Sequence, residues 1–259
     1  MVAFLKFWVF IAAAVLCACG DNIPANYAQV YERLWEQWGA GAPPTEVNLW
    51  LDSVEKQCTT KTDLAERLAC LQKAMPWPQD STNFSLWPHQ VLQNQAGQCV
   101  SLSFLALLAL ERLNIVANPV ALPGHVFIAV PDLQRNWEPN LQGYNHPFSY
   151  YAQNYALDSS QGRWAQSLSV AEFKGLVLYE MANAQAQWEN PPGVSAERKK
   201  ALKMYREAQK WWQDERIAGN LALLQANLGN ISAARRILDS LWESGYRSAE
   251  LERNREALP

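Results

Sequence analysis

The chain has 259 residues, of which 49% are hydrophobic and 18% are charged, and it contains 12 Trp and 9 Tyr. A chain this apolar and aromatic can bury a core, which excludes an intrinsically disordered protein. The formal net charge of −3 leaves no positive excess to neutralise phosphates, so we predict no binding of nucleic acid.

Residues 1–18 have the features of an export signal. Lys6 precedes an apolar run that ends at Leu16, which is too short to span a hydrocarbon core of about 30 Å. The next residues resemble the bacterial lipobox, and the small Ala18 favours cleavage before Cys19 over cleavage before Cys17. We therefore predict a lipid on Cys19 that holds the protein on a membrane of the cell envelope, facing the periplasm. A plain signal peptide and an uncleaved anchor are the alternatives.

Three amphipathic helices are expected between residues 27 and 75. Apolar residues recur at helical spacing in three stripes: Tyr27, Val30, Tyr31, Leu34 and Trp38; Val47, Trp50, Leu51 and Val54; Leu64, Leu68, Leu71 and Met75. Thr62 is expected to cap the third helix. Cys58 and Cys70 are expected to pair in an oxidising compartment, provided that the offset of the helices keeps their Cα atoms within about 7 Å.

An α+β core is predicted to follow. The run from Val100 to Leu113 is apolar on nearly every side, which indicates a helix buried within the domain, and Asn114 can end it in the left-handed conformation. Strands are expected at residues 115–121 and 125–130, with a third, short strand beginning at Trp137. The predicted fold is thus a helical N-terminal region, a buried helix with an antiparallel sheet, and a helical C-terminal region.

Three residues of this core can form a catalytic site. Cys99 starts the buried helix, where unpaired N–H groups and the helix dipole favour a thiolate, and its own N–H can help to stabilise an oxyanion. His125 opens the second strand and can act as a general base. Glu138 belongs to the expected neighbouring strand, about 5 Å away, and can orient the imidazole and stabilise its cation. Asp132 and Asn136 are the alternatives for this third role.

The order of cysteine, histidine and acid on helix, strand and strand is that of the papain and transglutaminase group. Three segments resemble the bacterial transglutaminase-like family that is often joined to tetratricopeptide repeats: Gly97–Ser103, Leu122–Ile128 and Trp137–Asn140. The resemblance is firmest over residues 90–145. It implies that Cys99 is the nucleophile, His125 the general base and Glu138 the orienting acid. Glu138 stands where the superfamily has Asp, so the acid here is longer by one methylene.

The remaining polar and aromatic residues have lesser roles. As in papain-like enzymes, a side-chain oxyanion donor is expected before the cysteine, and Gln93 is the candidate, with Asn94 as its competitor. His89 and His146 are interpreted as surface or loop residues. No metal or other cofactor is expected, because no C-x-x-C pair or H-E-x-x-H helix occurs. The aromatic residues at 146–155 either line a substrate groove or seal the domain.

The C-terminal part is predicted to be a repeat. Three residues recur 33 positions later, close to the tetratricopeptide period of about 34: Ala201, Tyr205 and Ala208 as Ala234, Leu238 and Leu241. We therefore divide the chain into a signal peptide (1–18), a transglutaminase-like domain (19–160) and tetratricopeptide-like repeats (165–259). Such repeats offer a concave surface for a protein partner, although a stack this short can also serve only to cover the catalytic domain.

These features predict a membrane-tethered cysteine hydrolase or acyltransferase that acts on a peptide or protein substrate through a thioester at Cys99. Hydrolysis is favoured over cross-linking, because water is the default acceptor and no second amine-binding feature is visible. The alternative is a non-catalytic envelope scaffold that binds protein partners through its repeats. Thioredoxin-type redox chemistry is disfavoured because no resolving cysteine lies near Cys99.

Overall fold

The computed structural model describes residues 23–78, 85–155, 157, 165–186 and 192–258. The predicted signal peptide and the predicted lipid attachment at Cys19 lie outside these residues. Within the described residues, no helix combines the length and the apolar character that crossing a membrane requires.

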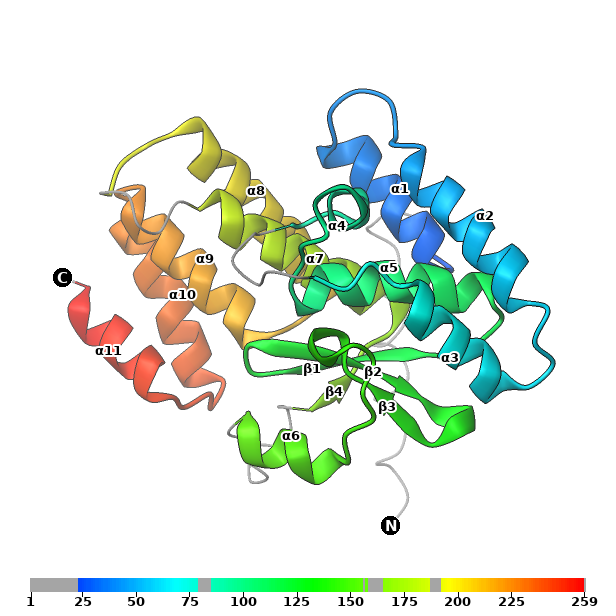
Figure 1. The fold of residues 1–259 in the computed structure, drawn as a ribbon. Helices are drawn as coiled ribbons and strands as arrows, with labels where there is room; N and C mark the ends of the chain where they lie inside the picture. Colours follow the sequence, from blue (N-terminus) through cyan, green and yellow to red (C-terminus); the bar gives the residue numbers. More distant parts are fainter. Residues whose placement is uncertain (1–22, 79–84, 156, 158–164, 187–191, 259) are drawn as a thin grey trace, which may run out of the picture.

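A small antiparallel sheet and one buried helix form the centre of the protein (Figure 1). The sheet has the strand order β3 (Arg135–Trp137), β2 (His125–Val130), β1 (Asn118–Leu122) and β4 (Gln166–Ser167). Helix α5 (Cys99–Arg112) packs on one face of this sheet, and every residue from Ser101 to Leu110 is buried. The α+β class and the buried helix are therefore as predicted, since a helix that is apolar all round has no face suited to water.

The opposite face of the sheet is covered by α6 (Phe148–Asn154). The ring of Tyr151 on α6 stacks on that of Phe127 on β2, with centroids 3.9 Å apart. Side chains of a strand alternate between the two faces, so Val126 and Ile128 belong to the main core, whereas Phe127 packs in a second, smaller cluster with Tyr151.

The helices that precede α5 in the described residues all pack against it: α1 (Tyr27–Trp38), α2 (Glu46–Cys58), α3 (Leu64–Ala74) and α4 (Pro88–Asn94). The first three match the predicted stripes. Helix α3 is capped by Asp63 and not by the expected Thr62, because the Asp63 carboxylate accepts the N–H of Glu66. The structure joins Cys58 and Cys70 in a disulfide with Cα atoms 5.6 Å apart. The offset between the two cysteines along the helices is small, because Cys58 is the last residue of α2.

Two of the three predicted strands have different boundaries in the structure. The first strand begins only at Asn118, after Asn114 has ended the helical segment with φ 54°, in the left-handed conformation that was predicted. The third strand begins at Arg135 and ends at Trp137, so Glu138 lies after it, at the N-cap of the 3₁₀-helix η2 (Pro139–Leu141). Pro139 explains this end, because proline has no N–H to donate to a strand ladder. A second 3₁₀-helix, η1 (Pro131–Leu133), joins β2 to β3.

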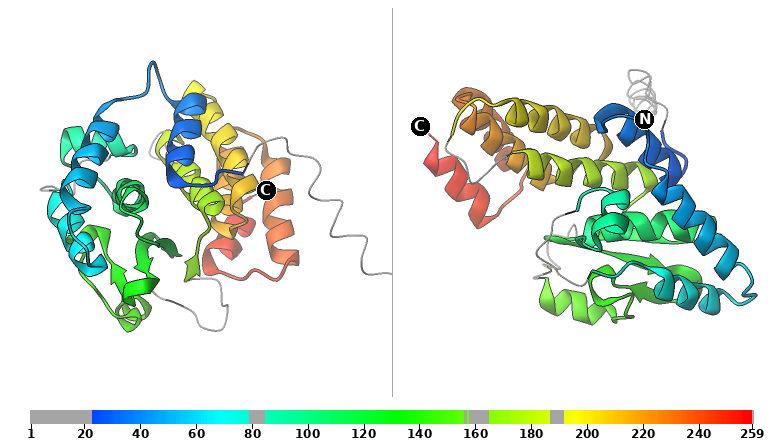
Figure 2. Two further views of the ribbon diagram at one scale, coloured as in Figure 1. Left: turned by 90° about the vertical axis from the view of Figure 1, so that its right-hand side faces the viewer. Right: turned by 45° about the horizontal axis from the view of Figure 1, so that its top comes forward.

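Five helices follow β4 in the described residues, and each packs against the next (Figure 2). They are α7 (Val170–Gln185), α8 (Ala196–Trp211), α9 (Glu215–Asn227), α10 (Ile231–Glu243) and α11 (Ala249–Ala257). Helix α7 also packs against α1 and α5, and the buried residues of α7, α8 and α9 share the main core. Helices α10 and α11 instead form a separate small core with α9.

Candidate active site

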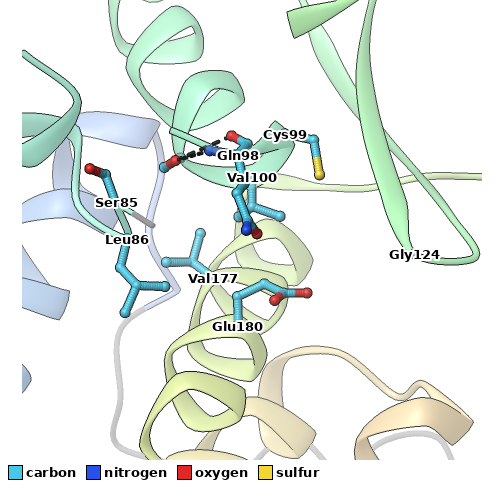
Figure 3. A pocket seen from close by; sticks show the side chains of 9 residues that line it. Ser85, Leu86, Gln98, Cys99, Val100, Gly124, Val177 and Glu180 are labelled. Atoms are coloured by element: carbon cyan, nitrogen blue, oxygen red, sulfur yellow. Dashed lines mark hydrogen bonds between the residues drawn. The ribbon is translucent and has the colours of Figure 1, made fainter. Parts of the chain in front are cut away.

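Cys99, the first residue of α5, lies in a pocket at the junction of the sheet and the C-terminal helices (Figure 3). The cavity has a volume of about 80 Å³ and opens to solvent. Its lining residues are Ser85, Leu86, Gln98, Cys99, Val100, Ser101, Gly124, Val177 and Glu180. The pocket thus combines the start of α5, the turn between β1 and β2, the segment before α4, and one face of α7.

The sulfur of Cys99 is placed against the start of β2. Strand β3 pairs with β2 only from Ile128 to Val130, so the pairing between these two strands does not extend to Val126. The backbone N–H of Val126 faces the Cys99 sulfur, and the N–H of Val100 does so as well; both favour the thiolate. The nucleophile predicted from the sequence therefore lies beside the residue that follows His125.

The protonation of Cys99 is governed by burial. Although Cys99 retains some exposed surface, protein atoms surround its sulfur on most sides, and this burial raises the pKa of the thiol to about 12. The negative charges of Glu180 and Glu138 raise the pKa further. The direction of this shift is opposite to that expected from the helix terminus, because desolvation outweighs the N–H groups that face the sulfur.

His125 and Glu138 form a buried hydrogen-bonded pair. The distance from His125 Nε2 to Glu138 Oε2 is 2.8 Å, and both side chains are 2% exposed. Because Trp137 pairs with Ile128, the register carried one residue further puts Glu138 opposite Phe127, on the same face of the sheet as His125. Because Nε2 of His125 is hydrogen-bonded to the Glu138 carboxylate, Nδ1 is the nitrogen of this ring that can exchange a proton with another group.

The Glu138 carboxylate is fixed by its own loop. The second carboxylate oxygen of Glu138 accepts a hydrogen bond from the backbone N–H of Asn140 at 3.0 Å. The backbone N–H of Glu138 donates to the carbonyl of Tyr144 at 3.1 Å. The alternatives for the third role lie elsewhere: Asp132 is exposed in η1, and the Asn136 side chain donates to the carbonyl of His146 at 2.7 Å. Of the three candidates, Glu138 is therefore the residue that reaches the imidazole.

Two tyrosines of the 146–155 segment enclose the imidazole. The ring of Tyr155 stacks on His125 with centroids 4.5 Å apart and an interplanar angle of 10°. Burial raises the pKa of Tyr155 to about 12, and the charges of Glu138 and Cys99 contribute, which places the Tyr155 hydroxyl near both groups. Burial and the charge of Glu138 also raise the pKa of Tyr151, whose buried hydroxyl makes no hydrogen bond of normal geometry among the described residues.

The predicted side-chain oxyanion donors do not line the pocket among the described residues. Gln93 is exposed, and its amide donates to Glu46 on α2 at 3.0 Å. Asn94 is also exposed, and its amide lies 3.4 Å from the hydroxyl of Ser85. Helix α4 ends at Asn94, and Gln95 then adopts φ 47°, which turns the chain before it reaches Cys99. The side chain of Gln98 enters the pocket instead (Figure 3).

The two other histidines lie outside the pocket. His89 is buried, in contrast to the predicted surface position, because it packs against Trp35 with ring centroids 5.2 Å apart and against Trp87 at 6.2 Å. This burial lowers the pKa of His89. His146 does lie in a loop, where it stacks on Tyr150 with centroids 3.7 Å apart.

Two charged residues of the C-terminal helices reach the site, and the motif reasoning missed both. Glu180 on α7 lines the pocket. Arg216 on α9 donates from Nη1 to the carbonyl of Leu122 at 2.6 Å, at the turn that precedes His125. A signal for Glu180 did exist, because this carboxylate lies in a largely buried, apolar stretch of α7 that runs from Phe173 to Ala182.

Comparison with known proteins finds a similarity in the central part of the chain. Residues 78–162 match the family model described as the transglutaminase-like superfamily. The match includes Cys99, His125 and Glu138, and it agrees with the resemblance seen in the motifs. No curated protein and no solved structure matches the chain. The chain is therefore an α+β protein in which residues 78–162 are similar to the transglutaminase-like superfamily, and a set of paired helices follows them.

Proposed function

We propose that the protein is a cysteine hydrolase or acyltransferase that attacks a peptide or amide bond and forms a thioester on Cys99. The observation that carries the proposal is the buried His125–Glu138 pair, 2.8 Å apart, beside the pocket that holds the Cys99 sulfur. The similarity of residues 78–162 to the transglutaminase-like superfamily supports the same chemistry.

The first half-reaction forms the thioester. The Cys99 sulfur attacks the carbonyl carbon while its proton passes to Nδ1 of His125, and the negative charge of Glu138 stabilises the resulting imidazolium. The backbone N–H of Cys99 and the amide of Gln98 are the proposed donors to the oxyanion. The C–N bond then breaks, the imidazolium returns its proton to the leaving amine, and the acyl group remains on sulfur.

The second half-reaction releases the acyl group. A water molecule attacks the thioester carbonyl, its proton passes to His125, the C–S bond breaks, and the sulfur recovers the proton. An incoming amine replaces the water in acyl transfer. Because burial keeps Cys99 protonated at rest, we expect proton transfer to coincide with attack, when bound substrate already fills the pocket.

Trapping the thioester tests this proposal. The purified full-length protein is incubated with cell-envelope extract and quenched in acid, and the Cys99 peptide is analysed by mass spectrometry. We expect an added acyl mass that hydroxylamine removes, and we expect no such adduct in the Cys99→Ala variant. An unmodified Cys99 peptide under all conditions, together with unchanged function of Cys99→Ala in cells, contradicts an enzymatic role.

The membrane anchor is a separate part of the proposal. We propose that Cys19 is the acylated residue and that the folded part faces the periplasm, since the sequence before Cys19 resembles a lipobox. Detergent phase partitioning and metabolic labelling with palmitate test this placement. Cys19→Ser is expected to lose the label and leave the detergent phase, whereas the matched Cys17→Ser variant keeps both. The opposite result assigns the lipid to Cys17.

A non-catalytic scaffold is the second candidate, and the raised pKa of Cys99 is the observation that favours it. In that case the paired helices, as tetratricopeptide-like repeats, bind a protein partner and the pocket is inert. Co-purification from crosslinked cells distinguishes the two. A scaffold keeps its partners and its cellular function when Cys99 is changed to Ala, whereas the enzyme loses its function with the same change.

A further inference from the structure

We infer that Glu180 makes the pocket beside Cys99 selective for substrates that carry a positively charged side chain of the lysine or arginine class. This inference rests on the proposed function and adds the substrate class to it. It assigns to α7, a helix outside the 78–162 match, a direct part in recognising the substrate.

The position of Glu180 is the first argument. Figure 3 shows the Glu180 carboxylate and the Gln98 amide extending into the same space that the Cys99 sulfur borders. The charge of Glu180 acts on Cys99, because it contributes to the raised pKa of that thiol. A group bound to the carboxylate therefore lies close enough to Cys99 to belong to the same substrate molecule.

The second argument is that the carboxylate is poorly satisfied by the protein. Among the described residues its hydrogen bond comes from the Asn183 amide, at the long distance of 3.5 Å. The oxygen of Asn183 is in turn shared, since it accepts from the Tyr205 hydroxyl at 2.6 Å and from the Asn220 amide at 2.8 Å. The oxygen of Asn183 is thus bound to two other side chains, and its amide makes only the long contact with Glu180.

The nearby cation does not neutralise Glu180. Arg216 acts on Glu180 at longer range, but its guanidinium is bound to the Asp214 carboxylate, with Nε–Oδ1 at 2.7 Å and Nη2–Oδ2 at 2.9 Å. Two carboxylates and one guanidinium leave one negative charge at the pocket wall when Glu180 is ionised. Burial raises the pKa of Glu180, while the Asn183 amide and the charge of Arg216 lower it by less.

The rest of the lining fits the stem of a basic side chain. Leu86 and Val177 provide apolar surface in the pocket (Figure 3). Lysine and arginine carry an aliphatic stem that packs on such surface and a cationic end that forms a charge-assisted hydrogen bond with a carboxylate. A neutral or acidic side chain leaves Glu180 without this compensation, and an acidic one adds repulsion.

Charged thiol reagents test the inference without requiring turnover. The full-length protein is treated with 2-aminoethyl methanethiosulfonate, a cation, and with 2-sulfonatoethyl methanethiosulfonate, an anion. In both cases the thiolate attacks the sulfenyl sulfur, methanesulfinate leaves, and a mixed disulfide forms on Cys99, which mass spectrometry of the Cys99 peptide quantifies. A change in the pKa of Cys99 alters both rates equally, so their ratio reports only the interaction of the reagent charge with the pocket.

We expect Glu180→Gln to lower the cation-to-anion rate ratio by about tenfold relative to wild type, and Glu180→Ala to do the same. Glu36→Gln removes the same charge from an exposed position on α1 and is expected to leave the ratio unchanged. Thermal melting of each variant checks that the fold is intact. An unchanged ratio in both Glu180 variants overturns the inference.

Peptide substrates then separate the inference from the proposed function. A peptide with lysine beside the scissile bond is compared with the same peptide containing acetyllysine. We expect wild type to prefer the lysine peptide by at least tenfold in kcat/KM and Glu180→Gln to lose the preference. Turnover of both peptides at equal rates by wild type refutes the role of Glu180 and leaves the enzyme proposal standing. A Glu180-dependent reagent ratio with no turnover of any peptide supports the cation site and contradicts the enzyme.

Discussion

At the scale of single residues, Cys99 is subject to two opposing effects. The N-terminus of α5 and the N–H groups of Val126 and Val100 stabilise a thiolate, while burial and two carboxylates favour the thiol. The balance lies on the side of the thiol, with a pKa of about 12. An imidazolium at His125 changes that balance, because it places a positive charge against the Glu138 carboxylate.

The alkylation of Cys99 by iodoacetamide is expected to be slow at neutral pH and to accelerate with pH. The thiolate is the reactive form, and a pKa raised to about 12 makes it scarce, so the rate should grow about tenfold per pH unit through pH 7–10. Glu180→Gln should accelerate alkylation at any fixed pH, since it removes a charge that raises this pKa. Rapid alkylation that is independent of pH down to 6 contradicts this picture and indicates a thiolate–imidazolium pair at rest.

Replacing Glu138 should have opposite effects on the alkylation rate of the Cys99 thiol and on kcat. Glu138→Gln removes a charge that disfavours the thiolate, so alkylation of Cys99 should become faster. The neutral amide cannot stabilise the imidazolium, so kcat should fall by about 10²–10⁴-fold. The control is Asp132→Asn, which removes the same charge from the exposed 3₁₀-helix η1 and should alter neither rate. Equal kcat values for Glu138→Gln and wild type rule out an orienting role for this residue.

At the scale of elements, the turn between β1 and β2 is hydrogen-bonded to a residue of the C-terminal helices. The guanidinium of Arg216 donates to the Leu122 carbonyl at 2.6 Å and lies 4.9 Å from the ring centroid of Trp212. This contact joins α9 to the residues immediately before His125. For the proposed reaction, we therefore expect Arg216 to act as a positioning residue, through the placement of the imidazole.

Arg216→Ala is expected to lower kcat by about tenfold and to leave KM for a neutral peptide nearly unchanged, because the loosened turn displaces the imidazole from a narrow geometry. Hydrogen exchange at residues 122–126 should accelerate in the same variant. Arg206→Ala, at an exposed position on α8, is the matched control and should change neither quantity. Unaltered exchange at the turn in Arg216→Ala shows that the contact does not restrain it.

The disulfide between α2 and α3 belongs to the same scale. It closes a short loop, with a sequence separation of 12, so its removal should cost about 3 kcal/mol of unfolding free energy. Denaturant titration of Cys58→Ser/Cys70→Ser against wild type measures this loss. A reducing agent should lower the stability of wild type to the same level and should not affect the double variant. Equal stability of both proteins under oxidising conditions is the contrary result.

Local patterns predicted most elements, but not the ends that matter for the site. The stripes from Tyr27 to Met75 located three helices, because apolar spacing is a property of each segment alone. Glu138 was expected within a strand and instead follows one. It reaches His125 through the fold of its loop, where the Asn140 N–H and the Tyr144 carbonyl hold it, and neither contact has a signature in the sequence.

At the scale of the whole molecule, the C-terminal helices divide into two parts. Buried residues of α7, α8 and α9 share the main core with α5, whereas α10 and α11 pack in their own cluster with Ala222 of α9. Helix α7 contributes residues to the pocket lining, and α9 contributes the hydrogen bond to the turn before His125. Helices α10 and α11 contribute no described residue to the pocket lining.

Two truncations from the C-terminal end should therefore differ in their effect on stability. A chain that ends at Gly229 lacks α10 and α11 and should keep its pocket, with a melting temperature lowered by a few degrees. A chain that ends at Ala186 also lacks α8 and α9, exposes the buried face of α7, and should lose the cooperative transition. Thermal melting and Cys99 alkylation measure both outcomes. Cooperative folding of the shorter chain contradicts a shared core.

The sequence by itself determined the α+β class, the buried helix and the choice of Cys99, His125 and Glu138 as candidates, because these depend on local periodicity and on the order of chemical groups along the chain. Only the tertiary structure decided the direction of the Cys99 pKa, since burial depends on what packs around the sulfur. It also placed Gln98 rather than Gln93 in the pocket and brought in two charged residues from distant helices. Arg216 and Leu122 are 94 residues apart, and contacts of that range follow from the packing of whole elements.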